Sequence, residues 1–189
     1  MLRLFGRACV RANLPVRQTQ GFNPRPRLSL PLPRPVGIAS DAERLLLELT
    51  AQLHPDEIAP RMTPHLPDGI TLRQSALVNH PSRHLPRLAR YCVPIPPDNA
   101  DALARNAARL MRFQPIPYDR FIHKTSRHVR LDLRPFIDAI VISGHHARFD
   151  LLVTAGGSAK PAEICHLLGL GDQNVNHLIR RRQVEWLLS

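Results

Sequence analysis

The spacing of apolar residues predicts a helix at the start of the chain, over residues 2–13. Its apolar side chains recur at helical intervals and would share one face: Leu2, Phe5, Cys9 and Ala12. Asn13 and Pro15 end the pattern. The outer side would carry a stripe of arginines that is either solvated or directed at phosphates: Arg3, Arg7 and Arg11.

Alternating apolar positions predict strands in the remainder of the first half. Residues 27–35 carry prolines at every second position, which removes hydrogen-bond donors along one edge and is typical of an edge strand. Residues 43–50 and 70–78 predict two more strands, and Pro55 begins a short helix between them. This order is that of a ferredoxin-like βαββαβ unit without its first strand, over residues 1–80.

The second half, residues 88–189, predicts another α+β unit after a proline-containing linker at 79–87. Strands are expected at 90–95, 116–123, 128–134, 138–143, 146–154 and 184–188, and helices at 98–112, 161–169 and 172–182. The predicted fold class is therefore α+β, with two small ferredoxin-like α/β sandwich units, the first lacking its initial strand.

The charge of the chain changes this picture by suggesting a partner. The 189 residues include 26 Lys and Arg against 15 Asp and Glu, a formal net charge of +11, and only two of the cations are lysines. Such an excess favours a polyanionic partner, nucleic acid first, although a genome rich in arginine codons would produce the same excess.

Cysteine and hydropathy patterns exclude several classes of protein. Cys9, Cys92 and Cys165 lie far apart without metal-ligand spacing, so we expect reduced thiols in a cytoplasmic protein, with no metal and no cofactor. No apolar run reaches membrane-spanning length, so no membrane partner is expected.

A short stretch, Gly21-Phe22-Asn23-Pro24-Arg25-Pro26-Arg27, is the first candidate binding site. Gly and Asn tolerate sharp backbone bends, and the two prolines favour extended geometry for the residues before them. The stretch predicts a stiff loop that presents guanidinium groups to a phosphate or a carboxylate, or a turn whose arginines are simply solvated. The candidate residues are Arg17, Gly21, Phe22, Asn23, Arg25 and Arg27.

A second set of cations surrounds a predicted strand connection: Lys124, Arg127, Arg130 and Arg134. Arg130 and Arg134 would share a strand face with Asp132, and a structural Asp–Arg pair is favoured there. The loop 156–160 before a helix is a weaker candidate for anion binding. His145-His146 and Cys165-His166 do not form a recognisable metal motif.

Several segments resemble one known family. They are Asn13-Leu-Pro-Val-Arg17, Gln20-Gly-Phe-Asn-Pro-Arg-Pro-Arg-Leu-Ser-Leu-Pro-Leu-Pro33, Val36-Gly-Ile-Ala-Ser40, Glu43, Leu66-Pro-Asp-Gly-Ile70, Asp132-Leu-Arg-Pro135 and Pro161-Ala-Glu-Ile164. With these the chain resembles the radical-SAM-associated domain family, whose members are fused to radical S-adenosylmethionine enzymes or encoded beside them. The chain lacks the CxxxCxxC motif of those enzymes, so we expect it to assist one rather than to be one.

The resemblance also implies that the family's first strand and its Ser-His-Leu-Asp segment would precede Met1. We therefore expect a defective first unit, in which strands 43–50 and 70–78 either pair directly or leave an apolar cleft. Three functions are expected: a non-catalytic RNA-binding module that assists a radical SAM enzyme, a protein adaptor that docks on that enzyme without nucleic acid, and an enzyme acting on a small anion. The enzyme is ranked last because no acid–base pair stands out.

Overall fold

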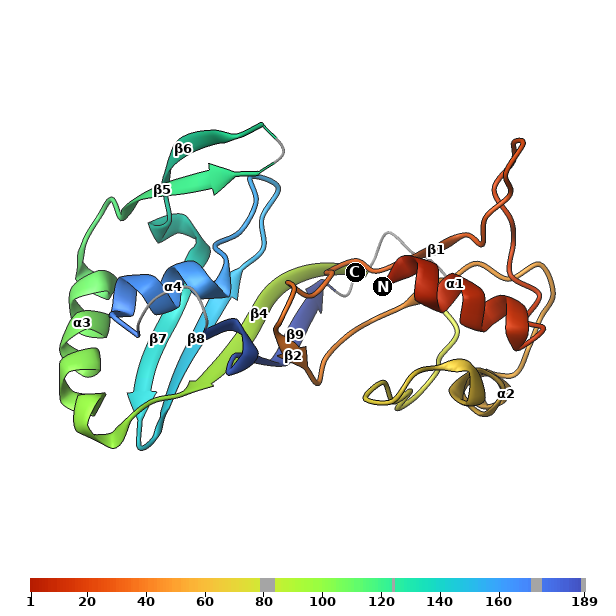
Figure 1. Cartoon of the computed structure of the whole chain (residues 1–189), viewed down its shortest axis with the longest axis horizontal. Helices are drawn as coiled ribbons and strands as arrows, with labels where there is room; N and C mark the ends of the chain where they lie inside the picture. Colours follow the sequence, from red (N-terminus) through yellow and green to blue (C-terminus); the bar gives the residue numbers. More distant parts are fainter. Residues whose placement is uncertain (79–83, 124, 171–174, 188–189) are drawn as a thin grey trace. The chain divides into compact units, whose positions relative to one another are not determined.

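The chain divides into two compact units in the computed structural model, which describes residues 1–78, 84–123, 125–170 and 175–187 (Figure 1). Unit 1 consists of residues 1–32 and 44–84, and unit 2 of residues 33–43 and 85–189. This division differs from the predicted ranges 1–80 and 88–189 because residues 33–43 belong to unit 2. Both units mix helices with β-structure, and the α+β class is confirmed.

Both helices predicted for unit 1 are present in its described residues. Helix α1 spans Leu2–Arg11 and helix α2 spans Pro55–Met62. A capping box begins α2. The His54 side chain accepts a hydrogen bond from the Asp56 amide, and the His54 amide donates one to Glu57 Oε1 at 3.1 Å. A short 3₁₀ turn, Thr63–His65, follows α2.

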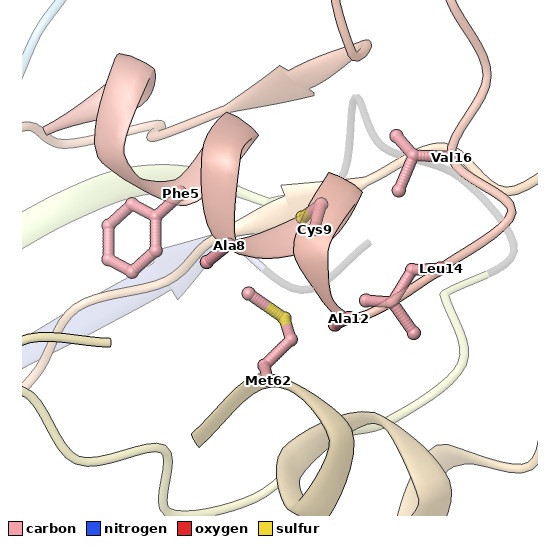
Figure 2. Close-up of a cluster of buried hydrophobic side chains, with 7 residues drawn as sticks. All are labelled: Phe5, Ala8, Cys9, Ala12, Leu14, Val16 and Met62. Atoms are coloured by element: carbon pink, nitrogen blue, oxygen red, sulfur yellow. The ribbon is translucent and has the colours of Figure 1, made fainter. Parts of the chain in front are cut away.

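The core of unit 1 lies between these helices. Figure 2 shows seven buried side chains directed toward one another from α1, the segment after it and the end of α2. They are Phe5, Ala8, Cys9, Ala12, Leu14, Val16 and Met62. The first four include the predicted apolar face of α1 apart from Leu2, which is exposed. The apolar spacing therefore identified the buried side of this helix correctly.

The strands of unit 1 are much shorter than predicted. β1, Leu28–Ser29, pairs antiparallel with β3, Leu46–Leu47. Residues 70–78 form no strand, so the predicted strand there is wrong, and they do not pair with 43–50. Ile70 and Leu72 are partly buried against the core, which accounts for the alternation that resembled a strand.

Unit 2 is built on a five-stranded sheet. Its strands are β2 (Ala39–Ser40), β4 (Leu85–Pro94), β7 (Ile137–Ser143), β8 (His146–Leu152) and β9 (Arg180–Leu187). Their spatial order is β2-β9-β4-β8-β7, and every pair is antiparallel except β2 with β9.

Two helices, α3 (Ala100–Arg112) and α4 (Pro161–Leu168), pack beside this sheet (Figure 1). The Asn106 side chain of α3 donates to the Leu168 carbonyl of α4 at 2.9 Å. Apolar residues of both helices and of the sheet are buried: Leu103, Leu110, Ile164, Leu168, Phe149 and Leu151. Helix α4 ends at Gly169, whose φ of 85° is left-handed and favours glycine.

A separate two-stranded hairpin, β5 (Pro117–Ile122) with β6 (Arg127–Asp132), is inserted between α3 and β7. Short 3₁₀ turns lie at Pro97–Asn99, Arg134–Phe136 and Val175–His177. No helix in the described ranges is long and apolar enough to cross a membrane.

One predicted helix of unit 2, at 172–182, is wrong. Its proposed cap, Asp172, lies outside the described residues, and residues 180–187 form strand β9. Strand β9 begins with three arginines, 180–182. They belong to a strand because their partners lie on β2 and just after it, about 140 positions earlier in the chain. Arg181 and Ser40, for example, are 141 residues apart. Local spacing could not reveal this pairing.

Candidate nucleic-acid interface

Residues 17–27 form a narrow hairpin, which we call the arginine hairpin. The Arg27 amide donates to the Arg17 carbonyl at 2.7 Å, and the Thr19 amide donates to the Arg25 carbonyl at 2.8 Å. The Arg25 amide donates to Thr19 Oγ1 at 3.0 Å. In Figure 1 the hairpin projects upward, away from helix α1, as a narrow loop. Gly21 has a φ of 131°, a conformation that favours glycine at the bend.

The base of the arginine hairpin is closed by a glutamate. Arg17 Nη1 lies 3.1 Å from Glu48 Oε1, and Arg27 Nη1 lies 3.1 Å from Glu48 Oε2. The backbones of these three residues are hydrogen-bonded as well. The Arg17 amide donates to the Glu48 carbonyl, and the Glu48 amide donates to the Arg27 carbonyl. Two of the predicted cations are thus already paired with one carboxylate, although all three side chains are about half exposed.

The tip of the arginine hairpin is open to solvent. Phe22 has a relative exposure of 106%, the value of a ring with nothing packed against it. Asn23 and Arg25 are also exposed, and Arg25 forms no ion pair with any described residue. The tip therefore combines a free aromatic ring with a cation three positions away.

Helix α1 lies against the base of the hairpin. A Cβ atom at Gly6 would come within 3.8 Å of both Pro26 and Leu28. The predicted stripe of Arg3, Arg7 and Arg11 is exposed, and none of its members forms an ion pair within the described part of unit 1. Counting only partners in the described ranges, Arg3, Arg7, Arg11 and Arg25 are thus exposed guanidinium groups without an ion pair, on two adjoining elements of unit 1.

The second predicted cluster does not assemble as one face. Arg127 and Arg130 are exposed on β6, but their odd spacing directs them to opposite faces of the strand. Arg134 does not share a strand face with Arg130, because β6 ends at Asp132 and a 3₁₀ turn begins at Arg134. Lys124 lies outside the described residues.

Arg134 and Asp132 have structural partners. Asp132 Oδ1 accepts the amides of Ile116 at 2.8 Å and Arg134 at 3.0 Å, and Arg134 Nη1 donates to the Ile137 carbonyl at 2.7 Å. The expected side-chain pair between Asp132 and Arg134 is replaced by these contacts with the backbone. Asp132 and Arg134 line a depression of about 280 Å³. Both side chains are engaged in holding the turn, so neither is available to a ligand there.

The loop 156–160 is not an open anion site. Glu163 Oε2 accepts the Lys160 amide at 2.8 Å, so a carboxylate of the chain occupies the start of α4. Arg120 of β5 binds the same carboxylate through Nε at 2.6 Å and Nη2 at 2.7 Å, and donates to the Ser158 carbonyl at 3.0 Å. Glu163 is almost fully buried, and this pair anchors the β5–β6 hairpin to α4.

The arginine run of β9 is also neutralised. Arg180 and Arg182 bind the two carboxylate oxygens of Asp41 at 2.7 and 2.9 Å. Arg181, whose side chain is fully buried, binds Glu43 and donates to Ser40 Oγ at 3.3 Å. Glu43 is therefore engaged by Arg181, and much of the chain's positive charge has a structural role.

Two of the three cysteines, Cys9 and Cys165, are buried, and Cys92 is partly exposed. Burial raises the pKa of the Cys165 thiol to about 12 and also raises the pKa of Cys9. Across the described ranges no three His, Cys, Asp or Glu side chains come close enough to hold a metal ion.

One aromatic site was missed by the sequence analysis. Phe121 of β5 is 39% exposed, and its ring centroid lies 4.9 Å from that of His123 and 5.1 Å from that of His128. His128 lies directly opposite Phe121 on β6. The strict alternation of β5 was the available signal, because it places Phe121 on the face opposite Arg120 and Ile122.

Comparison with known proteins places the chain in a family without assigning an activity. No curated protein matches it significantly. A model of the family described as "Uncharacterized protein conserved in bacteria (DUF2344)" matches residues 1–162. Because this match covers most of the chain and includes the arginine hairpin, the protein belongs to the DUF2344 family of conserved bacterial proteins.

Proposed function

We propose that the protein is a non-catalytic RNA-binding module and that the arginine hairpin is its principal contact. The observation that carries this proposal is the fully exposed Phe22, three positions from Arg25, which forms no ion pair with any described residue. An aromatic ring stacks on any nucleobase, and a guanidinium group binds phosphate. Phe22 is the most exposed of the large apolar side chains in the described residues, which makes its ring accessible to a base.

The charge distribution of unit 1 supports the same proposal. Arg3, Arg7 and Arg11 add three exposed guanidinium groups, without ion pairs to described residues, on α1, whose Gly6 lies against the base of the hairpin. Arg17 and Arg27 are held half exposed by Glu48, so a phosphate can compete for them. The RNA backbone would run along α1 and the hairpin, with one unpaired base on Phe22.

The proposal includes a radical SAM enzyme as the partner that modifies the bound RNA in the cytoplasm. Its support is the resemblance of residues 13–43 to the radical-SAM-associated family. In this arrangement the protein presents RNA, while the partner supplies the iron–sulfur cluster and the chemistry.

The proposal also assigns unit 2 a ferredoxin-like arrangement, which is supported by its topology. The elements β4, α3, β7, β8, α4 and β9 follow the order βαββαβ, and the sheet order β9-β4-β8-β7 is antiparallel throughout. The β5–β6 hairpin is then an insertion after the first helix.

Salt-dependent RNA titration tests the proposal. The full chain is titrated with a short single-stranded RNA of mixed sequence, and the slope of log K against log salt is measured. Each phosphate neutralised in a single strand contributes about −0.7 to this slope. We expect a steep negative slope, weaker binding for Phe22→Ala and Arg25→Ala, and unchanged binding for the exposed control variants Phe113→Ala and Arg105→Ala in unit 2. Absence of binding at low salt would refute the proposal.

A protein adaptor is the second candidate, favoured by the same exposed Phe22, which could insert into a partner's pocket. This candidate predicts that a complex with the radical SAM enzyme survives high salt and nuclease treatment. It also predicts that the complex is lost in Phe22→Ala while RNA titration of the isolated chain shows no binding.

A further inference from the structure

We propose that unit 2 contains a second RNA contact on the outer face of the β5–β6 hairpin, and that it binds an unpaired nucleotide. The base would stack on Phe121, and the phosphate would bind Arg130 and His128. This proposal rests on the proposed RNA-binding function and adds a separate site to it.

The β5–β6 hairpin is held firmly from its inner face. An isolated two-stranded hairpin is marginally stable in water, so it needs support. The buried Arg120–Glu163 pair supplies this support, and the rings of Tyr118 and His166 meet edge to face at 5.9 Å. Asp132 holds the base of the hairpin through two backbone amides. The outer face is therefore presented on a fixed support.

The outer face carries exposed side chains whose ring contacts are made within the hairpin itself. Strand alternation and the register place Phe121 opposite His128 and Asp119 opposite Arg130 on this face. All four are exposed. Arg130 forms no ion pair with Asp119 or with any other residue of the described ranges. Together the face offers an aromatic ring, an imidazole and a guanidinium group without an ion pair among the described residues, with the Asp119 carboxylate opposite Arg130.

These three groups match an unpaired nucleotide. A base can stack on the open side of Phe121, next to the tilted ring of His128. Arg130 lies two residues along β6 from His128, on the same face, where it can reach the phosphate. A duplex has no free base for the ring, so single-stranded RNA is the expected ligand class.

The test compares ring variants of the full chain in binding to the same short single-stranded RNA and to its duplex. We expect Phe121→Ala and Phe121→Leu to weaken single-strand binding roughly 5-fold or more, the lower end of the effect of losing one base–aromatic stack. Phe121→Tyr should retain binding, and Phe113→Ala serves as the exposed control in unit 2. Phe121→Leu keeps an apolar side chain on β5, so it separates loss of the ring from loss of the hairpin.

The outcomes distinguish this site from the proposed function. If wild-type protein binds RNA and Phe22→Ala weakens it, while Phe121→Leu and Phe121→Ala match Phe113→Ala, the second site is overturned and the proposed function stands. If wild-type protein binds no RNA, both fail. If Phe121→Tyr loses binding as fully as Phe121→Leu, the ring does not stack and the second site is also overturned.

Discussion

Glu48 and Arg27 are joined twice, through the backbone and through their side chains. The Glu48 amide donates to the Arg27 carbonyl at 3.1 Å, and Arg27 Nη1 lies 3.1 Å from Glu48 Oε2. Because Glu48 also holds Arg17, one carboxylate controls two of the cations at the base of the arginine hairpin.

This relationship predicts that Glu48→Gln binds RNA more tightly than the wild-type protein. The substitution keeps the size of the side chain but releases Arg17 and Arg27 to bind phosphates. The salt slope for single-stranded RNA should become more negative by up to about 1.4, or about 0.7 for each released cation. The pairs are half exposed, so folding stability should change little.

The matched control for this prediction is Asp68→Asn, which removes another exposed carboxylate from unit 1. If both variants increase affinity equally, the gain reflects net charge alone. Weaker binding by Glu48→Gln would mean that Glu48 is needed to shape the hairpin, contrary to our account.

The buried pair of Arg120 and Glu163 predicts a strong effect on stability. Removing one partner of a buried ion pair typically costs about 3–5 kcal/mol because the other charge remains buried. We expect Glu163→Ala to lower the free energy of unfolding of unit 2 by roughly this amount in urea denaturation, whereas Asp119→Ala on the exposed face should stay within about 0.5 kcal/mol. Equal effects of the two would show that the pair does not anchor the hairpin.

The ion pairs of Asp41 with Arg180 and Arg182 predict that the attachment of β2 to β9 depends on pH. Burial alone would raise the pKa of Asp41, but hydrogen bonds from Arg182 and Arg180 outweigh it and hold the pKa below its usual value. A carboxyl with a lowered pKa stabilises the fold above its unfolded value of about 3.9, and this contribution is lost as the pH falls through the folded value.

Amide hydrogen exchange can measure the attachment of β2 to β9 directly. The amides of residues 39 and 41 donate to the carbonyls of Ile179 and Arg181. We expect Asp41→Asn to exchange faster than wild type at these amides near neutral pH, and the difference to shrink below about pH 4. A difference that is constant across the pH range would contradict the role of the charged carboxylate.

Burial of the thiols predicts their order of alkylation. Cys92 is partly exposed, whereas Cys9 and Cys165 are buried and their pKa values are raised. Because the thiolate is the reactive form, iodoacetamide should label Cys92 first in the native protein, and the other two only after unfolding. Rapid labelling of Cys165 in the folded state, read from peptide masses, would contradict the buried core around α4.

Local sequence patterns correctly predicted the secondary-structure elements that are determined by residues within the element itself. The apolar spacing of α1, the proline that begins α2 and the glycine that ends α4 all lie within the element they define. The bend at Gly21 likewise lies within the seven-residue stretch that predicted a loop there. Such features need no knowledge of distant partners.

The remaining features depend on residues far apart in the chain. Arg180, Arg181 and Arg182 resembled a helical basic run, yet they belong to a strand because Asp41 and Glu43 pair with them. Likewise, Arg17 and Arg27 looked free because Glu48 lies 21 residues beyond Arg27. Phe121 was overlooked because only the register of β5 with β6 brings His128 beside it.

Site-specific photo-crosslinking at position 22 tests the central claim most directly. Phe22 is replaced by the photoreactive analogue benzoyl-phenylalanine in the full chain, with position 113 as the exposed control, and cells are irradiated before purification. We predict a nuclease-sensitive RNA adduct at position 22 that is absent at position 113. A nuclease-resistant adduct with protein alone would contradict RNA binding by the arginine hairpin and would favour the adaptor.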